Sequence, residues 1–423
     1  MSPPITGVGI DFGTTNSVVA FAHADGRVES AMWPTPEGPT STFRTALTFW
    51  REGREVRHVA GPEAIARAES PVGEQRFVQS LKTYLASRAF AETRLYGQRF
   101  TIEALVATFL ADLTAGHALG AAIVGGRPVT FAGQNADKEL AVSRLQAAYA
   151  QAGMPGVALA YEPLGAAYWY ARGLTRDETV LVADFGGGTS DFSVMRFSRQ
   201  AGRGAARVVA EPLSHAGIGI AGDTFDYRIL DHVVSPRLGK GATYRSFDKA
   251  LPIPAYVHAS FAQWHQLSWL KSGTILADLR KLAAASDRGD ELEALATIVE
   301  MDMGLALYRA VGETKAALSR ADAAPLRFSG FDVSIEAEVT RADFEGWIKD
   351  DLAAIEATVD DALARAGIGD DGVDAVFLTG GTSFVPAVRG LFARRFRPER
   401  LHQGDAFQSV ASGLALLAAD RAA

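Results

Sequence analysis

Short apolar runs alternate along most of the chain with stretches of helical periodicity. Residues 8–10 and 180–183 form apolar runs of the kind that fill a strand buried on both faces. Residues 101–120 instead carry Leu105 and Phe109 at helical spacing, among other apolar side chains. Strands and helices that alternate in this way predict an α/β fold of layered lobes around mainly buried sheets.

Three consecutive glycines follow the second of these apolar runs. Asp184 precedes glycines 186–188, and the hydroxyl of Thr189 follows them. The N–H groups of such a turn can point into one concavity that suits phosphate oxygens. A neighbouring carboxylate is what a phosphate-bound magnesium ion needs. A plain β-hairpin turn is the alternative, because residues 190–195 alternate like a second strand.

The same pattern occurs after the first apolar run. Asp11, Phe12 and Gly13 are followed by the hydroxyls of Thr14 and Thr15 and then by a second strand-like stretch. A repeated strand, Asp-Phe-Gly turn and strand predicts two similar lobes that face one ligand from opposite sides. Two hairpins that share Asp-Phe-Gly by chance remain the alternative.

A third glycine turn follows the buried run at residues 374–379. Gly380 and Gly381 lead into Pro386, near the start of an amphipathic helix. A helix that opens behind such a turn offers N–H groups and a positive dipole end to an anion. Alone, this pattern is typical of any strand-to-helix turn, but the two Asp-Phe-Gly turns favour a binding role.

Two other patterns indicate less than they suggest. Residues 217–222 match the GxGxxG dinucleotide fingerprint, but Asp231, at the distance of the expected carboxylate, falls in a helical stretch rather than at a strand end. Asp-Phe-Gly also occurs in protein kinases, whose other motifs are missing here. We therefore favour neither a nicotinamide enzyme nor a kinase of that class.

Composition narrows the class of protein further. The chain has 423 residues, no cysteine and a formal net charge of −7, with 48% hydrophobic and 22% charged residues. This balance is ordinary for a globular protein of two or more domains, and it excludes disulfides and thiol catalysis. The net negative charge argues against nucleic acid and anionic membranes as partners. With no signal-type or membrane-spanning stretch, we expect a cytoplasmic protein.

Taken in order, the motifs resemble the actin-like ATPase domain of the seventy-kilodalton heat-shock chaperones, the DnaK-type family, and its actin and sugar-kinase relatives. The pairing of DFGTTNS with GGGT favours the chaperone branch. The stretches that carry the resemblance are GIDFGTTNS (9–17), AYEPLGAAYWYARGL (160–174), DFGGGTSDFS (184–193), GIGIAGDTFD (217–226), VGETKAALS (311–319) and LTGGTSFVP (378–386).

The resemblance implies an ATP- and ADP-binding protein with Mg²⁺, two lobes and a nucleotide cleft between them. The expected phosphate-binding residues are Gly13, Thr14, Thr15, Gly186, Gly187, Gly188, Thr189 and Gly222. The expected surroundings of magnesium, largely through its waters, are Asp11, Glu162 and Asp184, and with Thr189 these form the expected catalytic set. The expected adenosine-binding residues are Lys315, Ser319, Gly380, Gly381 and Phe384.

The same resemblance predicts the domain organisation. We expect lobe I at residues 1–178, lobe II at 179–400 with a helical insert at about 235–325, and a closing C-terminal helix at 401–423. Family members of full length continue into a peptide-binding domain, for which this sequence shows no counterpart. We therefore expect a chaperone homologue that lacks the client-binding module, with unknown clients and co-chaperones.

Three positions depart from the family pattern. Phe384 and Ala316 stand where the family carries adenine-stacking arginines, so an aromatic ring would stack on adenine and the preference for ATP over GTP is open. Ile65 is aligned with the catalytic lysine of the family. An apolar side chain supplies no positive charge, so we expect slow hydrolysis. Arg67 and Lys82 are possible substitutes, although a surface role is expected for each.

The sequence thus predicts a magnesium-dependent, slowly hydrolysing ATPase of the heat-shock chaperone type. A sugar or small-molecule kinase of the same fold is one alternative, which stimulation of ATP turnover by polyols would favour. An actin-like filament former is the other, which nucleotide-dependent sedimentation would favour.

Overall fold

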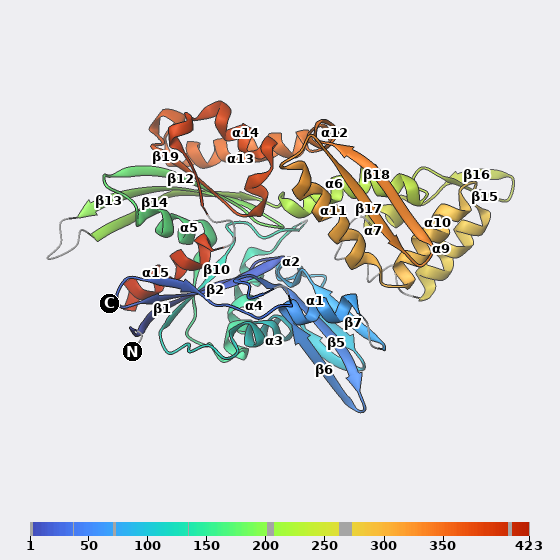
Figure 1. Cartoon of the computed structure of the whole chain (residues 1–423), viewed down its shortest axis with the longest axis horizontal. Coiled ribbons are helices and arrows are strands. Elements are labelled where there is room, and N and C mark those ends of the chain that lie inside the picture. Colours follow the sequence, from blue (N-terminus) through green and yellow to red (C-terminus); the bar gives the residue numbers. More distant parts are fainter. Residues whose placement is uncertain are drawn as a thin grey trace. The chain divides into compact units, whose positions relative to one another are not determined.

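The contacts of the chain divide it into two compact units (Figure 1). The first comprises Met1–Gly222 and Leu352–Ala423, and the second comprises Asp223–Asp351. Within the described ranges, no helix is both long and apolar enough to cross a membrane. This computed structural model describes residues 3–36, 38–70, 73–133, 135–200, 207–261, 273–404 and 408–422.

The first unit contains two central sheets, and the first of them has three parallel strands followed by antiparallel ones. Strand β1 pairs parallel with β10 and antiparallel with β2, and β10 pairs parallel with β11. The strand order is β11 (Ala158–Tyr161), β10 (Ala122–Arg127), β1 (Ile5–Asp11), β2 (Asn16–His23) and β3 (Val28–Ser30), and β4 (Phe43–Arg44) also pairs with β2.

The second central sheet repeats this topology. Its strand order is β20 (Leu401–Gln403), β19 (Ala375–Thr379), β12 (Glu178–Phe185), β13 (Ser190–Gln200) and β14 (Arg207–Ile218). Strand β12 pairs parallel with β19 and antiparallel with β13, as β1 does with β10 and β2. The repeated topology agrees with the duplication that the two Asp-Phe-Gly turns predict. Helices α13 (Lys349–Ala366) and α14 (Pro386–Arg395) flank β19 in the chain.

Two helices rich in small residues connect the sheets. Helix α5 (Glu162–Ala171) and helix α15 (Ser409–Ala422) share one apolar core with β10, β12, β13 and β19. A Cβ atom on Gly413 would lie 1.7 Å from the carbonyl oxygen of Gly165, and one on Gly9 would lie 2.1 Å from that of Ala411. Only glycine allows α15 to approach both α5 and β1 this closely.

A set of smaller elements lies between β4 and β10 in the chain. The helix expected at residues 101–120 is present as α3, although it ends earlier than expected, at Thr114, ahead of Gly116 at φ +78°. The elements are β5 (Ala46–Glu52), β6 (Glu55–Ala60), α1 (Gly61–Glu69), β7 (Gln75–Gln79), α2 (Leu81–Tyr84), β8 (Glu92–Leu95), β9 (Gln98–Thr101), α3 (Ile102–Thr114) and, after β10, α4 (Lys138–Gln151). Strands β6, β5 and β7 form one small sheet.

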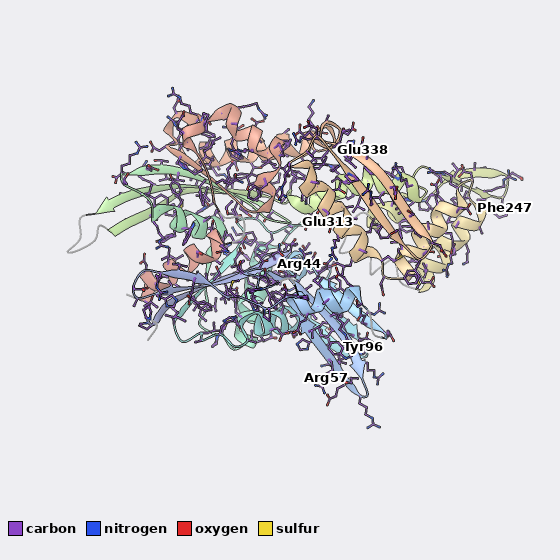
Figure 2. All side chains as sticks on the ribbon, viewed as in Figure 1. Arg44, Arg57, Tyr96, Phe247, Glu313 and Glu338 are labelled. Carbon is purple, nitrogen blue, oxygen red and sulfur yellow. The ribbon has the colours of Figure 1, made fainter. Side chains whose placement is uncertain are left out.

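The second unit is mainly helical and carries two hairpins. Phe247, at the tip of the first hairpin, is 97% exposed and points away from the unit (Figure 2). Residues 262–272 of the expected insert lie outside the described residues. The elements are α6 (Gly222–Ile229), β15 (Thr243–Ser246), β16 (Lys249–Pro252), α7 (Ala255–Phe261), α9 (Gly273–Ala285), α10 (Gly289–Glu300), α11 (Gly304–Leu318), β17 (Ala323–Gly330), β18 (Val333–Thr340) and α12 (Arg341–Trp347).

Candidate functional site

The predicted carboxylates lie at corresponding ends of the two central sheets. Asp11 is the last residue of β1, and Asp184 is the penultimate residue of β12. In each sheet the chain then turns back into an antiparallel strand. A Cβ atom on Gly188 would lie 3.3 Å from Oγ1 of Thr14, so the second turn lies against the first. The structure brings the two predicted phosphate loops together.

Backbone contacts fix the shape of each turn. A Cβ atom on Gly13 would lie 2.0 Å from the carbonyl oxygen of Asn16, so no other residue fits this close approach. The carbonyl oxygen of Thr15 accepts a hydrogen bond from the N–H of Thr45 at 2.9 Å. In the second turn, the N–H of Gly186 donates to the carbonyl oxygen of Thr189 at 2.9 Å.

The third glycine turn meets the second. Gly380 has φ +83°, and a Cβ atom there would lie 2.1 Å from the carbonyl oxygen of Phe185. The Thr382 hydroxyl donates to the carbonyl oxygen of Gly186 at 3.1 Å, and the N–H of Gly222 approaches the same oxygen at 3.4 Å. Two remote parts of the sequence, the third turn and Gly222, therefore meet the second turn at Gly186. Gly381 begins a short 3-10 turn that ends at Phe384, just before α14.

Lys82 lies in the middle of the carboxylates, and the expectation of a surface role for it is wrong. Its Nζ is 2.5 Å from Oε1 of Glu162, the first residue of α5, and the two side chains are only 7% and 8% exposed. Lys82 belongs to the four-residue helix α2, in which Leu81 precedes it, and Leu81 and Leu85 are buried in an apolar core of the first unit. The apolar flanks draw the short helix inward, and the buried ammonium finds a carboxylate there.

Among the described contacts, neither Ile65, at the expected lysine position, nor the nearby Arg67 reaches this cluster. Ile65 is half-buried on α1. The Arg67 guanidinium stacks over the Trp50 ring, with 3.7 Å between Cζ and the ring centroid. The premise that the site lacks a cationic side chain is therefore wrong, because Lys82 supplies one from a position 17 residues further along than Ile65.

Asp191 is a fourth carboxylate of the cluster, and the predicted set omitted it. It is 1% exposed and pairs directly opposite Asp184 across β12 and β13. Its Oδ1 accepts hydrogen bonds from the N–H groups of Val129 at 2.8 Å and Thr130 at 3.1 Å. These bonds tie the second sheet to the segment that follows β10.

The cluster holds more carboxylates than cations, and the pKa values of three of its carboxyl groups are raised as a result. Burial and the charge of Glu162 raise the pKa of Asp11 to about 7, although Lys82 opposes the shift. Burial and Glu162 likewise raise the pKa of Asp191 to about 7. Burial, Glu162 and Asp11 raise the pKa of Asp184 well above its ordinary value. Burial lowers the pKa of Lys82, but Glu162 and Asp11 outweigh it and leave that pKa raised.

The donor set fits a hydrated magnesium ion. Within the described ranges, no group of three or more His, Cys, Asp or Glu side chains is arranged to hold a metal ion directly. Magnesium, however, prefers oxygen donors and usually keeps several of its waters. The hydroxyl of Tyr149 is buried without a hydrogen-bond partner among those residues, and Asp11 and Glu162 raise its pKa beyond the effect of burial. Surplus carboxylates and an unpartnered hydroxyl suit a cation with bound water.

Two of the expected adenosine contacts belong to the second unit. Nζ of Lys315 on α11 is 2.8 Å from Oδ1 of Asp226, and the Ser319 hydroxyl lies 3.5 Å from the carbonyl oxygen of Lys315. Phe384, in the first unit, is 48% exposed beside the third turn. The roles of all three toward a nucleotide stay predictions.

Comparison with known proteins decides the family. The family model described as Hsp70 protein matches residues 75–242 and 299–420, which is more than half of the chain. The chain belongs to the Hsp70 family. It is 26% identical over 421 residues to the chaperone proteins DnaK of Thermotoga petrophila and Thermotoga maritima, which covers 97% of this chain and 59% of each relative. The DnaK of Thermosipho africanus is also 26% identical over 421 residues and is covered to 58%. The predicted family and actin-like fold are confirmed.

The sequence carries a signal for the burial of Lys82 and another for the position of Asp191. Lys82 stands between Leu81 and Leu85 with no other charge from residue 77 to residue 87, which is unusual for an exposed lysine. Asp184 and Asp191 lie at equal distances along the chain from the middle of the turn, between Gly187 and Gly188. A tight hairpin over this turn therefore pairs the two residues.

Proposed function

We propose that this Hsp70-family chain binds ATP and ADP with magnesium at the three glycine turns and hydrolyses ATP there. The observation that carries the proposal is the buried Lys82–Glu162 pair, which lies among the carboxylates at the ends of two sheets of equal topology. Glycine turns that face each other offer backbone N–H groups to phosphate oxygens from both sides.

The residues of the cluster divide the chemical work. Asp11, Glu162 and Asp184 would hold magnesium through its waters, and the ion would neutralise phosphate charge. Lys82 brings a positive side chain beside these carboxylates. Phosphoryl transfer depends mainly on such positioning and charge neutralisation, so a fixed ammonium beside the phosphates would favour the transition state.

The rate expected from Ile65 alone has to be revised. Slow hydrolysis followed from the supposed lack of a lysine, and Lys82 removes that reason. We therefore propose that the protein hydrolyses ATP with Lys82 as its cationic group. The adenine contacts of Phe384 and Lys315 remain part of the proposal, as does the preference for ATP over GTP.

A chaperone role follows from the family at a coarser level. The chain spans about three fifths of the length of the DnaK relatives that it matches. We propose that nucleotide binding and hydrolysis switch the chain between conformations that a protein partner reads. A cytoplasmic location, clients and co-chaperones belong to this proposal and need their own experiments.

Calorimetric titration of the protein with ATP, ADP and GTP, with and without magnesium, tests the binding step. We expect magnesium-dependent binding of ADP and ATP that Asp11→Asn and Asp184→Asn each weaken at least tenfold, because each variant removes one carboxylate charge. Asp25→Asn is the matched control, because Asp25 is an exposed carboxylate of the same unit paired with Arg27.

Unchanged nucleotide affinity in both Asp variants would overturn the proposed site. Hydrolysis that only polyols stimulate would instead indicate a small-molecule kinase. Nucleotide-dependent sedimentation of the pure protein would indicate a filament former.

A further inference from the structure

Arg144 is a buried arginine on α4 whose guanidinium binds one neighbouring segment of backbone. It is 9% exposed. Its Nη1 donates to the carbonyl oxygens of Tyr84 at 3.3 Å, Leu85 at 3.1 Å and Ser87 at 2.9 Å, and its Nη2 donates to that of Phe90 at 3.0 Å. All four acceptors lie in the chain that follows Lys82.

Glu103 on α3 fixes the guanidinium from the other side. Oε1 of Glu103 is 3.3 Å from Nε of Arg144 and is part of a side chain that is 22% exposed. The guanidinium is thereby held in one orientation, because its donors form a rigid planar fork. Arg144 connects two long helices, α3 and α4, to the end of the short helix α2.

Helix α2 needs such support to hold its position. It has only four residues, and one helical turn is not stable by itself in water. Its last carbonyl groups have no partner inside the helix: that of Tyr84 accepts the N–H of Ser87 at 3.1 Å, and Arg144 adds a side-chain donor to it and to the carbonyl of Leu85. Ser80, just before the helix, adopts φ +55°, a left-handed conformation that is unfavourable for a non-glycine residue.

The apolar contacts of α2 keep the helix buried, but they do not by themselves fix its rotation about its own axis. Leu81 and Leu85 are 1% and 0% exposed and hold the helix in the core. Hydrophobic burial is not directional, whereas hydrogen bonds to fixed carbonyl groups are. In the rotation that the structure shows, Nζ of Lys82 lies 2.5 Å from Oε1 of Glu162.

We propose that Arg144 is a positioning residue, which holds α2 so that the ammonium of Lys82 stays against Glu162. The inference deepens the proposed function and rests on it for the rate measurements below. Arg144 touches no reacting group itself. Its effect on the reaction would pass entirely through Lys82.

Single-turnover hydrolysis of ATP and calorimetric binding of Mg-ADP test the proposal in Arg144→Gln and Arg144→Lys. We expect Arg144→Gln to slow hydrolysis roughly 10- to 100-fold, because small displacements of a catalytic group have effects of this size. Mg-ADP affinity should stay within about threefold, because the glycine turns are untouched. Arg144→Lys should restore part of the rate, since one ammonium can bind some of the four carbonyl groups.

A double-mutant cycle with Lys82→Met separates positioning from general destabilisation. If Arg144 acts through Lys82, Arg144→Gln should have no further effect on the rate once Lys82 is replaced. A full and independent effect in the Lys82→Met background would overturn the proposal.

Arg400→Gln is the matched control. The Nη1 of Arg400 also binds two backbone carbonyls, those of Val373 at 2.9 Å and Asp370 at 3.4 Å, ahead of β19. We expect this variant to lower the melting temperature without slowing hydrolysis. An equal loss of rate in both arginine variants would show that Arg144 has only a structural role.

Amide hydrogen exchange of nucleotide-free protein gives a readout that needs no activity. We expect Arg144→Gln to speed exchange in residues 81–90, and expect the cycle of Arg144→Gln with Lys82→Met to be non-additive in the free energy of unfolding. Wild-type protein that does not hydrolyse ATP would contradict the proposed function. Unchanged exchange in residues 81–90 or an additive cycle would contradict the positioning role, whatever the activity.

Discussion

The Asp11 turn and the Asp184 turn have the same backbone plan and different electrostatic surroundings. Asp11 pairs opposite Val18 across β1 and β2, so an apolar side chain is its neighbour in the sheet. Asp184 pairs opposite Asp191 across β12 and β13, where two like charges face each other. Like charges directly opposite each other destabilise an antiparallel pair.

The cation of the cluster comes from outside both sheets. Lys82 belongs to α2, in the group of small elements between β4 and β10. The corresponding stretch of the second half, between β14 and β19, contains the second unit instead. Duplication therefore accounts for the paired turns, whereas the inserted elements make the charges around them unequal.

Among the variants considered, replacing Lys82 should have the largest effect, because it removes the cation that makes the charges around the two Asp turns unequal. Lys82→Met keeps the length of the side chain and leaves Glu162 and Asp11 without their cation. We expect ATP hydrolysis to fall about a hundredfold or more, as when a charge that stabilises a transition state is removed. Breaking one partner out of a buried ion pair also costs roughly 3–5 kcal/mol of stability. Single-turnover hydrolysis and urea unfolding measure the two effects.

Ile65→Lys is the control for that prediction. A lysine at the half-buried Ile65 of α1 should not raise the rate of the wild-type protein or restore that of Lys82→Met. A rate restored by Ile65→Lys would show that the reaction uses the position of Ile65 after all and that Lys82 has only a structural role.

Removing a single carboxylate should change the stability of the nucleotide-free protein less than Lys82→Met does. The change should also have the opposite sign, an increase in the free energy of unfolding. A carboxyl group whose pKa is higher in the folded state favours folding below about pH 4, and this contribution is lost as the pH rises through the folded-state value. The raised pKa of Asp11, to about 7, and the higher one of Asp184 therefore make the folded state less stable at pH 8 than at pH 5.

Asp184→Asn and Asp11→Asn should each stabilise the free protein at pH 8, by roughly 1–3 kcal/mol. Asp184→Asn should stabilise it more, because burial, Glu162, Asp11 and Asp191 together raise the pKa of Asp184 well above its ordinary value, whereas burial and Glu162 raise that of Asp11 to about 7. Urea unfolding at pH 5 and pH 8 measures the difference, which should shrink at pH 5. Equal gains in both variants would mean that the two turns do not differ as the structure indicates.

The sequence predicted the parts of this site that depend on local backbone. The glycine turns with Asp11 and Asp184 occur where local patterns placed them, because a turn needs glycine whatever surrounds it. Glu162, which only the family resemblance implied, begins α5. Lys82 could not be placed by spacing, because its burial depends on contacts between α2 and residues far along the chain. Its partner Glu162 is 80 residues away.

The groups that surround the carboxylates, and so set their pKa values, also come from distant parts of the sequence. The pairing of Asp184 with Asp191 follows from hairpin register, but the N–H groups that bind Asp191 come from Val129 and Thr130, about 60 residues earlier. Local sequence predicts which side chains end a strand. It does not predict which other strand ends will meet them.

The third turn should give the smallest effect, because it carries no carboxylate and Phe384 offers only a ring. Phe384 is 48% exposed at the end of the short turn that begins at Gly381. We expect Phe384→Ala to weaken ADP and ATP binding by about 0.5–1.5 kcal/mol, which is the usual size of a stacking contact. Pyrophosphate binding with magnesium should not change, since the two Asp turns would hold the phosphates.

Phe247→Ala is the matched control, an exposed phenylalanine of the second unit that lies at a hairpin tip. Calorimetry on both variants measures the difference, and a loss of pyrophosphate affinity equal to that of ADP would show that Phe384 supports the turns rather than the base.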